Sequence, residues 1–95
     1  MSRKYEGLIV LDTRGMEGSV DDLVGDIAKE LEAEGVKLEE IEQLGRKKFV
    51  YVSHHVDGGH YVRYVFEAEP EAIEPIKTRL KLHEKVHYQH YQRLD

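Results

Sequence analysis

One stretch of this chain, from Leu44 to Tyr64, constrains the fold more than any other. It opens with a glycine and three consecutive cations, continues as an aromatic and β-branched run, turns at a Gly-Gly pair and ends in a second aromatic run. Two such runs around a glycine turn predict a β-hairpin. Because an isolated hairpin is only marginally stable in water, the rest of the chain must supply surfaces that pack against it.

The N-terminal part of the chain predicts a strand and a helix. Tyr5–Leu11 reads as a central strand, because its second half is apolar on both faces. Residues 20–34 follow as a helix with one apolar stripe, Ser19 as its N-cap and Gly35 as the residue that ends it. The acidic face of this helix is most simply explained as solvated surface.

Three further strands and a second helix are predicted after Gly35. Residues 36–43 form a strand whose alternation changes phase at Glu39-Glu40, which indicates a β-bulge, and the strand continues through residues 49–52 after a bend at Gly45. Residues 53–59 form the turn and residues 60–68 the next strand, with a core face made of Val62, Tyr64, Phe66 and Ala68.

Proline shapes the last part of the chain. Because Pro75 would delete a hydrogen bond in the interior of a helix, we expect Pro70–Glu74 to form a distorted or separate turn and a regular helix to begin near Pro75. A final strand over Val86–Leu94 closes the chain.

The element order is therefore βαββαβ in a single domain, residues 1–95. Right-handed crossovers turn this order into an α+β, ferredoxin-like split βαβ fold, with an antiparallel sheet in the order 4-1-3-2 and both helices on one face. The other face is left open and carries Leu8 and Val10. Either neighbouring long side chains cover these two residues, or they belong to a partner surface.

Charge is distributed unevenly along the chain. The formal net charge is -5, but residues 16–44 alone carry ten acids against two bases. Cations gather around Arg46, Lys47 and Lys48, near the N-terminus and toward the end of the chain, and they could converge at one side of the sheet. There is no cysteine, and no apolar run is long enough to span a membrane, so a cytosolic protein is expected.

The residues give little support to catalysis or to a metal site. Six histidines are present, but their spacing on predicted strands does not bring a ligand set together, and no nucleophile has an evident base. We expect no enzyme activity, no metal and no cofactor. Basic residues near tyrosines on an open sheet are compatible with RNA, because cations position phosphates, although these aromatics serve equally well as core or protein contacts.

At this point the chain resembles the bacterial small-subunit ribosomal protein six family. The resemblance covers almost the whole sequence, and its most specific element is Gly45–Tyr51, a glycine followed by basic residues, hydrophobes and a tyrosine. Val50 replaces the small residue usual in the family, and Ser53-His54-His55 stands where the family typically has an isoleucine and cations.

The resemblance implies a ferredoxin-like, non-enzymatic component of the small ribosomal subunit, located in the cytoplasm and monomeric when isolated. It implies binding to the central domain of small-subunit rRNA, in the platform, together with small-subunit ribosomal protein eighteen. By position in the sequence, the residues expected at the RNA are Arg3, Lys4, Arg46, Lys47, Lys48, His54, His55 and Arg93. The residues expected at the protein partner are Leu8, Val10, Tyr51 and Tyr88.

One other function stays open at the level of the sequence. A free-standing ferredoxin-like module could dimerise through its open sheet face, either as an interaction domain or as a ligand sensor. This alternative requires Leu8, Val10 and the strand tyrosines to be buried between two copies of the chain.

Overall fold

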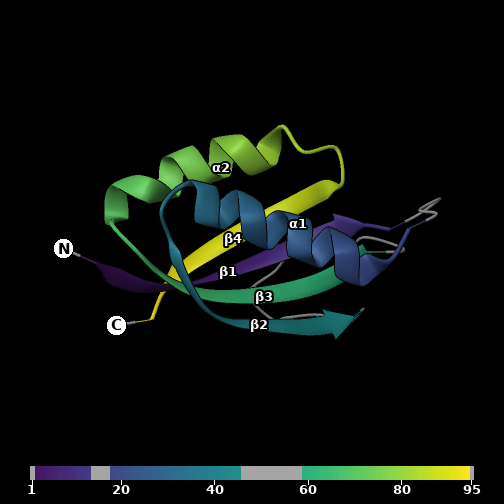
Figure 1. Ribbon diagram of the computed structural model, residues 1–95, viewed down its shortest axis with the longest axis horizontal. Helices are drawn as coiled ribbons and strands as arrows, with labels where there is room; N and C mark the ends of the chain where they lie inside the picture. Colours follow the sequence, from purple (N-terminus) through teal and green to yellow (C-terminus); the bar gives the residue numbers. More distant parts are fainter. Residues whose placement is uncertain (1, 14–17, 46–58, 95) are drawn as a thin grey trace.

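The computed structural model describes residues 2–13, 18–45 and 59–94. The elements follow the predicted βαββαβ order, with one additional 3-10 turn before the second helix (Figure 1). Their bounds are β1 Arg3–Asp12, α1 Val20–Ala33, β2 Lys37–Gly45, β3 Gly59–Ala68, η1 Pro70–Ala72, α2 Ile73–Lys81 and β4 Val86–Arg93.

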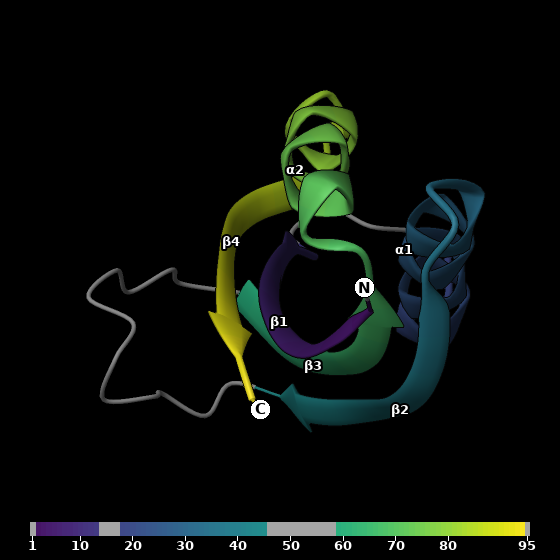
Figure 2. The same ribbon diagram turned by 90° about the vertical axis from the view of Figure 1, so that its left-hand side faces the viewer.

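The four strands form one antiparallel sheet in the order β2-β3-β1-β4. Read from the β4 edge, this is the predicted order 4-1-3-2, so the ferredoxin-like prediction is confirmed. Both helices lie on one face of the curved sheet, α1 on the side of β2 and α2 on the side of β4 (Figure 2). We call this the helix face and the opposite one the open face.

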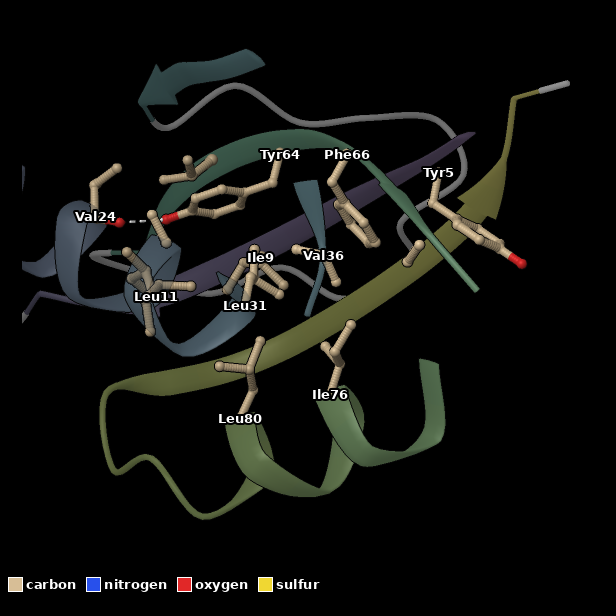
Figure 3. Packing of buried hydrophobic residues seen from close by; sticks show 14 of the residues in the cluster. Tyr5, Ile9, Leu11, Val24, Leu31, Val36, Tyr64, Phe66, Ile76 and Leu80 are labelled. Carbon is tan, nitrogen blue, oxygen red and sulfur yellow. Dashed lines mark hydrogen bonds between the residues drawn. The ribbon is translucent and has the colours of Figure 1, made fainter. Parts of the chain in front are cut away.

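The main core lies between the helices and the helix face of the sheet (Figure 3). The predicted stripe of α1 supplies five buried side chains, and the predicted core set of β3 is buried against them. Tyr64 also links the sheet to α1 by a hydrogen bond, because its hydroxyl donates to the carbonyl oxygen of Val24 at 2.8 Å. The principal members are Ile9, Leu11, Leu23, Val24, Ile27, Leu31, Val62, Tyr64, Phe66, Ile76 and Leu80.

The signals at the ends of α1 act as predicted. The Ser19 hydroxyl accepts a hydrogen bond of 3.1 Å from the Asp21 amide, which satisfies one of the free N–H groups of the first turn. Gly35, just after the helix, has a φ of 86°, in the left-handed region that glycine adopts without steric cost.

The β2 strand has the irregularity that its sequence predicts. Its register against β3 shifts between Leu38 and Glu40, so the bulge at Glu39 is confirmed. A second shift falls between Gln43 and Gly45, where Gly45 has a φ of 65°. The predicted continuation of this strand through residues 49–52 lies outside the described residues.

The prediction for the second helix was right about the turn and wrong about the start. Pro70–Ala72 forms a separate 3-10 turn, but the regular helix begins at Ile73 and not near Pro75. Pro75 is therefore the third residue of α2, within the first turn. Since N–H groups there have no partner inside the helix, the missing N–H of proline removes no helical hydrogen bond.

Gly7 allows an aromatic ring to lie against the central strand. It pairs across the sheet with Tyr91 of β4, and a Cβ atom added at Gly7 would lie 2.9 Å from Cε1 and 3.1 Å from Cδ1 of that ring. Both approaches are closer than carbon atoms normally allow, so an alanine must displace the ring.

Gly7→Ala is therefore expected to destabilise the protein by about 1–2 kcal/mol, toward the lower end of overpacking costs because the half-buried ring can tilt. Denaturant unfolding measures this change. Gly25→Ala in α1 is the matched control: apart from its chain neighbours and the nearby backbone of its own helix, no described residue has an atom within 4 Å of the added Cβ, and alanine favours a helix, so stability should rise by about 0.5–1 kcal/mol. Equal effects of the two substitutions would contradict the close contact with Tyr91.

Buried tyrosines should make the fold sensitive to alkali. Burial raises the pKa of Tyr64 above its usual value. Burial also raises the pKa of Tyr91, and electrostatic interaction with the nearby Tyr64 adds a smaller increase. Their folded-state pKa values exceed the unfolded value of about 10, so stability is unaffected below that pH and falls as the pH rises beyond it. Denaturant midpoints measured upward from neutral pH should decline above about pH 10, and less steeply in Tyr64→Phe/Tyr91→Phe.

Candidate nucleic-acid interface

Three of the predicted RNA-contacting residues gather at one end of the sheet. Arg93 pairs with Tyr5, and the amide of Leu94 donates a hydrogen bond of 2.8 Å to the carbonyl oxygen of Lys4. Strand alternation places Arg3 and Arg93 on the helix face and Lys4 on the open face. The structure therefore brings Arg3, Lys4 and Arg93 together along the chain ends, but it divides them between the two faces.

Lys4 is partly engaged within the protein. Its Nζ atom lies 3.2 Å from a carboxylate oxygen of Glu39 in β2, and both side chains keep contact with solvent. An exposed pair of this kind contributes little to stability, so it can exchange for a contact with a stronger anion.

The remaining predicted RNA contacts, Arg46, Lys47, Lys48, His54 and His55, and the predicted partner contact Tyr51, lie outside the described residues. Gly45, the described residue before Arg46, pairs with Tyr61, which in turn pairs with Val10. Arg3 pairs with Ala68 at the opposite end of the same sheet. Gly45 therefore lies about 20 Å along the sheet from Arg3. Convergence of all the cations at one side stays a prediction, because Arg46, Lys47 and Lys48 lie outside the described residues.

The open face carries a small second core. Leu8 and Val10 have 0% exposed area and Tyr61 2%, and the partly buried Leu44 and Tyr88 pack against them. In the isolated chain, neighbouring side chains therefore already cover Leu8 and Val10, which is the first of the two explanations offered for these residues. Of the four predicted partner contacts, Tyr88 keeps some exposure, whereas Leu8 and Val10 have none.

An ion-pair network occupies the open face beside this second core. Arg63 donates to Glu6 at 2.5 Å and to Glu40 at 3.2 Å, and it lies 3.6 Å from Glu42. The hydrogen bond to Glu6 is the main cause that raises the pKa of Arg63. Together with the adjacent pair of Lys4 and Glu39, the network contains more carboxylates than cations: Glu6, Glu39, Glu40 and Glu42 against Lys4 and Arg63. Sequence reasoning missed the network, because only the strand register brings Arg63 between β1 and β2.

This open face is a poor platform for nucleic acid. Tyr61 is too deeply buried to stack on a base, and the carboxylates would repel phosphates. An anionic surface beside a partly exposed tyrosine fits a cationic protein segment better.

The histidines of the described segments do not form a metal site. His60 lies on the helix face, where its Nε2 atom is 3.0 Å from Oε1 of Gln43, whose amide donates at 2.8 Å to Asp21. Partial burial lowers the pKa of His60, and the charge of Asp21 opposes this effect. Among the described residues, no group of three or more His, Asp or Glu side chains is arranged to hold an ion.

Comparison with known proteins identifies the family. Residues 4–89 match the family model described as ribosomal protein S6. This chain belongs to the ribosomal protein S6 family. The match covers the described fold apart from a few residues at its two ends. It identifies a structural protein of the small ribosomal subunit, from a family that is not one of enzymes. The predicted family is thus confirmed.

Individual relatives support the same assignment, and one solved structure has the same fold. The small ribosomal subunit protein bS6 of Akkermansia muciniphila is 43% identical over 94% of this chain and 95% of that protein. The protein of the same name from Dehalococcoides mccartyi is 27% identical over 88% of this chain and 77% of that protein. The crystal structure of 30S ribosomal protein S6 from Thermotoga maritima has a TM-score of 0.79 and 19% identity, and covers 99% of this chain and 89% of that one.

Membership of this family implies association with the ribosome. Among the described residues, no helix is long and apolar enough to cross a membrane.

Proposed function

We propose that this member of the S6 family binds the central domain of small-subunit rRNA, in the platform, together with small-subunit ribosomal protein eighteen. Family membership over most of the chain is the observation that carries the proposal. The chain is acidic overall, and a basic partner would supply much of the positive charge that RNA binding requires.

The charges of the residues indicate which of them contact RNA and which contact the partner protein. RNA contacts are assigned to Arg3, Lys4 and Arg93 and, outside the described residues, to Arg46, Lys47, Lys48, His54 and His55. The last two would contribute according to their protonation. Partner contacts are assigned to Tyr88 and Tyr51, with the carboxylates around Arg63 facing a cationic partner surface. Leu8 and Val10 support Tyr88 from beneath and would not touch the partner directly.

Without its partner, the protein is proposed to be a monomer. The alternative, a homodimer through the open face, needed Leu8 and Val10 to be buried between two copies. Because each chain already covers these residues itself, that dimer would gain no apolar burial from them.

Reconstitution tests the proposal directly. Purified chain, ribosomal protein eighteen and a central-domain rRNA fragment should form a ternary complex, and a tagged chain should sediment with small subunits. Charge reversal of Arg46, Lys47 and Lys48 should weaken binding and flatten its salt dependence by about one unit of slope for each phosphate that is no longer neutralised. Absence of the chain from small subunits, together with failure to bind the partner and RNA, would remove the proposal.

A further inference from the structure

Charge is segregated between the two halves of the described fold. Residues 19–45, which form α1 and β2, carry nine acids and two lysines. Residues 73–94, which form α2 and β4, carry five cations and two acids. The chain is therefore acidic overall only because one half outweighs the other.

The topology turns this segregation along the sequence into a segregation in space. The sheet order places β2 and β4 at opposite edges. Figure 2 shows α1 beside β2 and α2 beside β4, so the acidic and basic pairs of elements lie on opposite sides of the domain. An approaching polyanion would meet an attractive side and a repulsive side.

Three lysines of the basic half, Lys77, Lys81 and Lys85, make no strong ion pair with the described residues. Arg79 differs, since it donates to Glu34 at 2.7 Å and to Glu30 at 2.8 Å and so links α2 to α1. Lys77 lies 3.6 Å from Glu74, but both side chains are substantially exposed, so the pair is weak. Lys81 is exposed at the end of α2, and Lys85 is half-buried in the loop that leads into β4.

Lys77 and Lys81 share a hollow between α2 and the β4 edge. They are one helical turn apart, and the hollow is completed by Glu74, Thr78 and Gln89. The Gln89 amide donates at 3.0 Å to the carbonyl oxygen of Lys77, and its own oxygen accepts at 2.7 Å from the Tyr91 hydroxyl. These bonds hold the strand edge at a set position against the helix.

The lining of this hollow distinguishes between two kinds of partner. The five described residues that line it are polar or charged, and two of them are lysines. Protein interfaces are usually centred on apolar or aromatic residues, and none is among these five, whereas phosphate oxygens bind ammonium and hydroxyl donors, which the lysines and Thr78 offer.

We propose that the edge formed by α2 and β4, through Lys77, Lys81 and Lys85, is a surface that meets the phosphate backbone of RNA. The inference rests on the proposed function and extends it to residues outside the motif that carries the family resemblance. Lys85 precedes the start of β4 (Val86–Arg93) and Arg93 is its last residue, so these lysines extend the cationic surface along the β4 edge away from the cluster of Arg3, Lys4 and Arg93. Lysine contacts to phosphates strengthen binding without reading the base sequence.

Two double variants, each of which loses two positive charges, test this inference. Lys77→Gln/Lys81→Gln removes two positive charges from the basic half, and Lys29→Gln/Lys37→Gln removes two exposed ones from the acidic half. Affinity for a central-domain rRNA fragment, in the presence of ribosomal protein eighteen, is measured from low to high salt. The first variant should lose about tenfold in affinity at low salt, and its salt slope should fall by about two. The second should match the wild type in slope.

Each outcome has a definite meaning. Equal loss in both variants would overturn the inference, because net charge and not position would then govern binding, and an unchanged slope in the first variant would overturn it too. Loss of ribosomal protein eighteen from the complex, with RNA affinity intact, would reassign the edge to protein. Failure of the wild-type chain itself to bind RNA would instead refute the proposed function. Thermal unfolding checks that both variants remain folded, since surface changes of this kind shift stability by about 0.5 kcal/mol or less.

Discussion

Replacing Leu8 by alanine is expected to destabilise the isolated protein by about 2–5 kcal/mol, the cost of a cavity in a packed core. Leu8 has 0% exposed area although it lies on the face that the helices leave uncovered. It packs with Val10 and Tyr61, under the partial cover of Leu44 and Tyr88. If this second core belongs to the monomer, the loss must be present without any partner, and urea unfolding of the purified chain measures it.

Leu82→Ala is the matched control for this experiment. It makes the same chemical change at a side chain that is 82% exposed, at the end of α2, so it should alter stability by no more than about 0.5 kcal/mol. A loss below about 1 kcal/mol for Leu8→Ala would mean that the open face is loosely packed in the free chain. Leu8 would then return to the partner surface to which sequence reasoning assigned it.

Replacing Arg63 by glutamine is expected to cost about 1.5–3 kcal/mol, the range for hydrogen bonds to charged groups. The effect comes mainly from Glu6, whose side chain is only 12% exposed and would keep its charge without its nearest cation. Glu40 and Glu42 are more than half exposed, so water compensates them and their share is small.

A double-mutant cycle separates these contributions. Glu6→Gln should recover part of the loss in the Arg63→Gln background, because it removes the carboxylate that was left without its cation. Glu42→Gln is the control partner and should show little coupling to Arg63. Equal coupling of Arg63 to Glu6 and to Glu42 would show that solvent screens both pairs and that the network does not organise the open face.

Local periodicity was enough to predict most of the fold. The apolar stripe of α1, its Ser19 cap and the glycine that follows it all act within a few residues, so no knowledge of distant contacts was needed. The bulge at Glu39 was visible as a phase change in alternation for the same reason. Element order and crossover handedness then left one favoured sheet order, which the structure has.

The start of α2 shows where local rules stop being sufficient. Pro75 correctly indicated a break after Pro70, but its position could not distinguish a helix that begins at Ile73 from one that begins two residues later. Proline is compatible with any position in the first turn, so burial of Ile76 and Leu80 against the sheet decides where the helix begins.

By itself, the sequence determined the fold class, the family and the presence of separate basic and acidic segments, because each is written in contiguous residues. Only the tertiary structure decided what these segments face. It buried Leu8 and Val10 under side chains from other strands, set Arg63 among acids from β1 and β2, and placed Arg3 and Gly45 at opposite ends of the sheet. The physical reason is register: alternation along one strand chooses a face, but only pairing between strands fixes which charges and side chains meet on it.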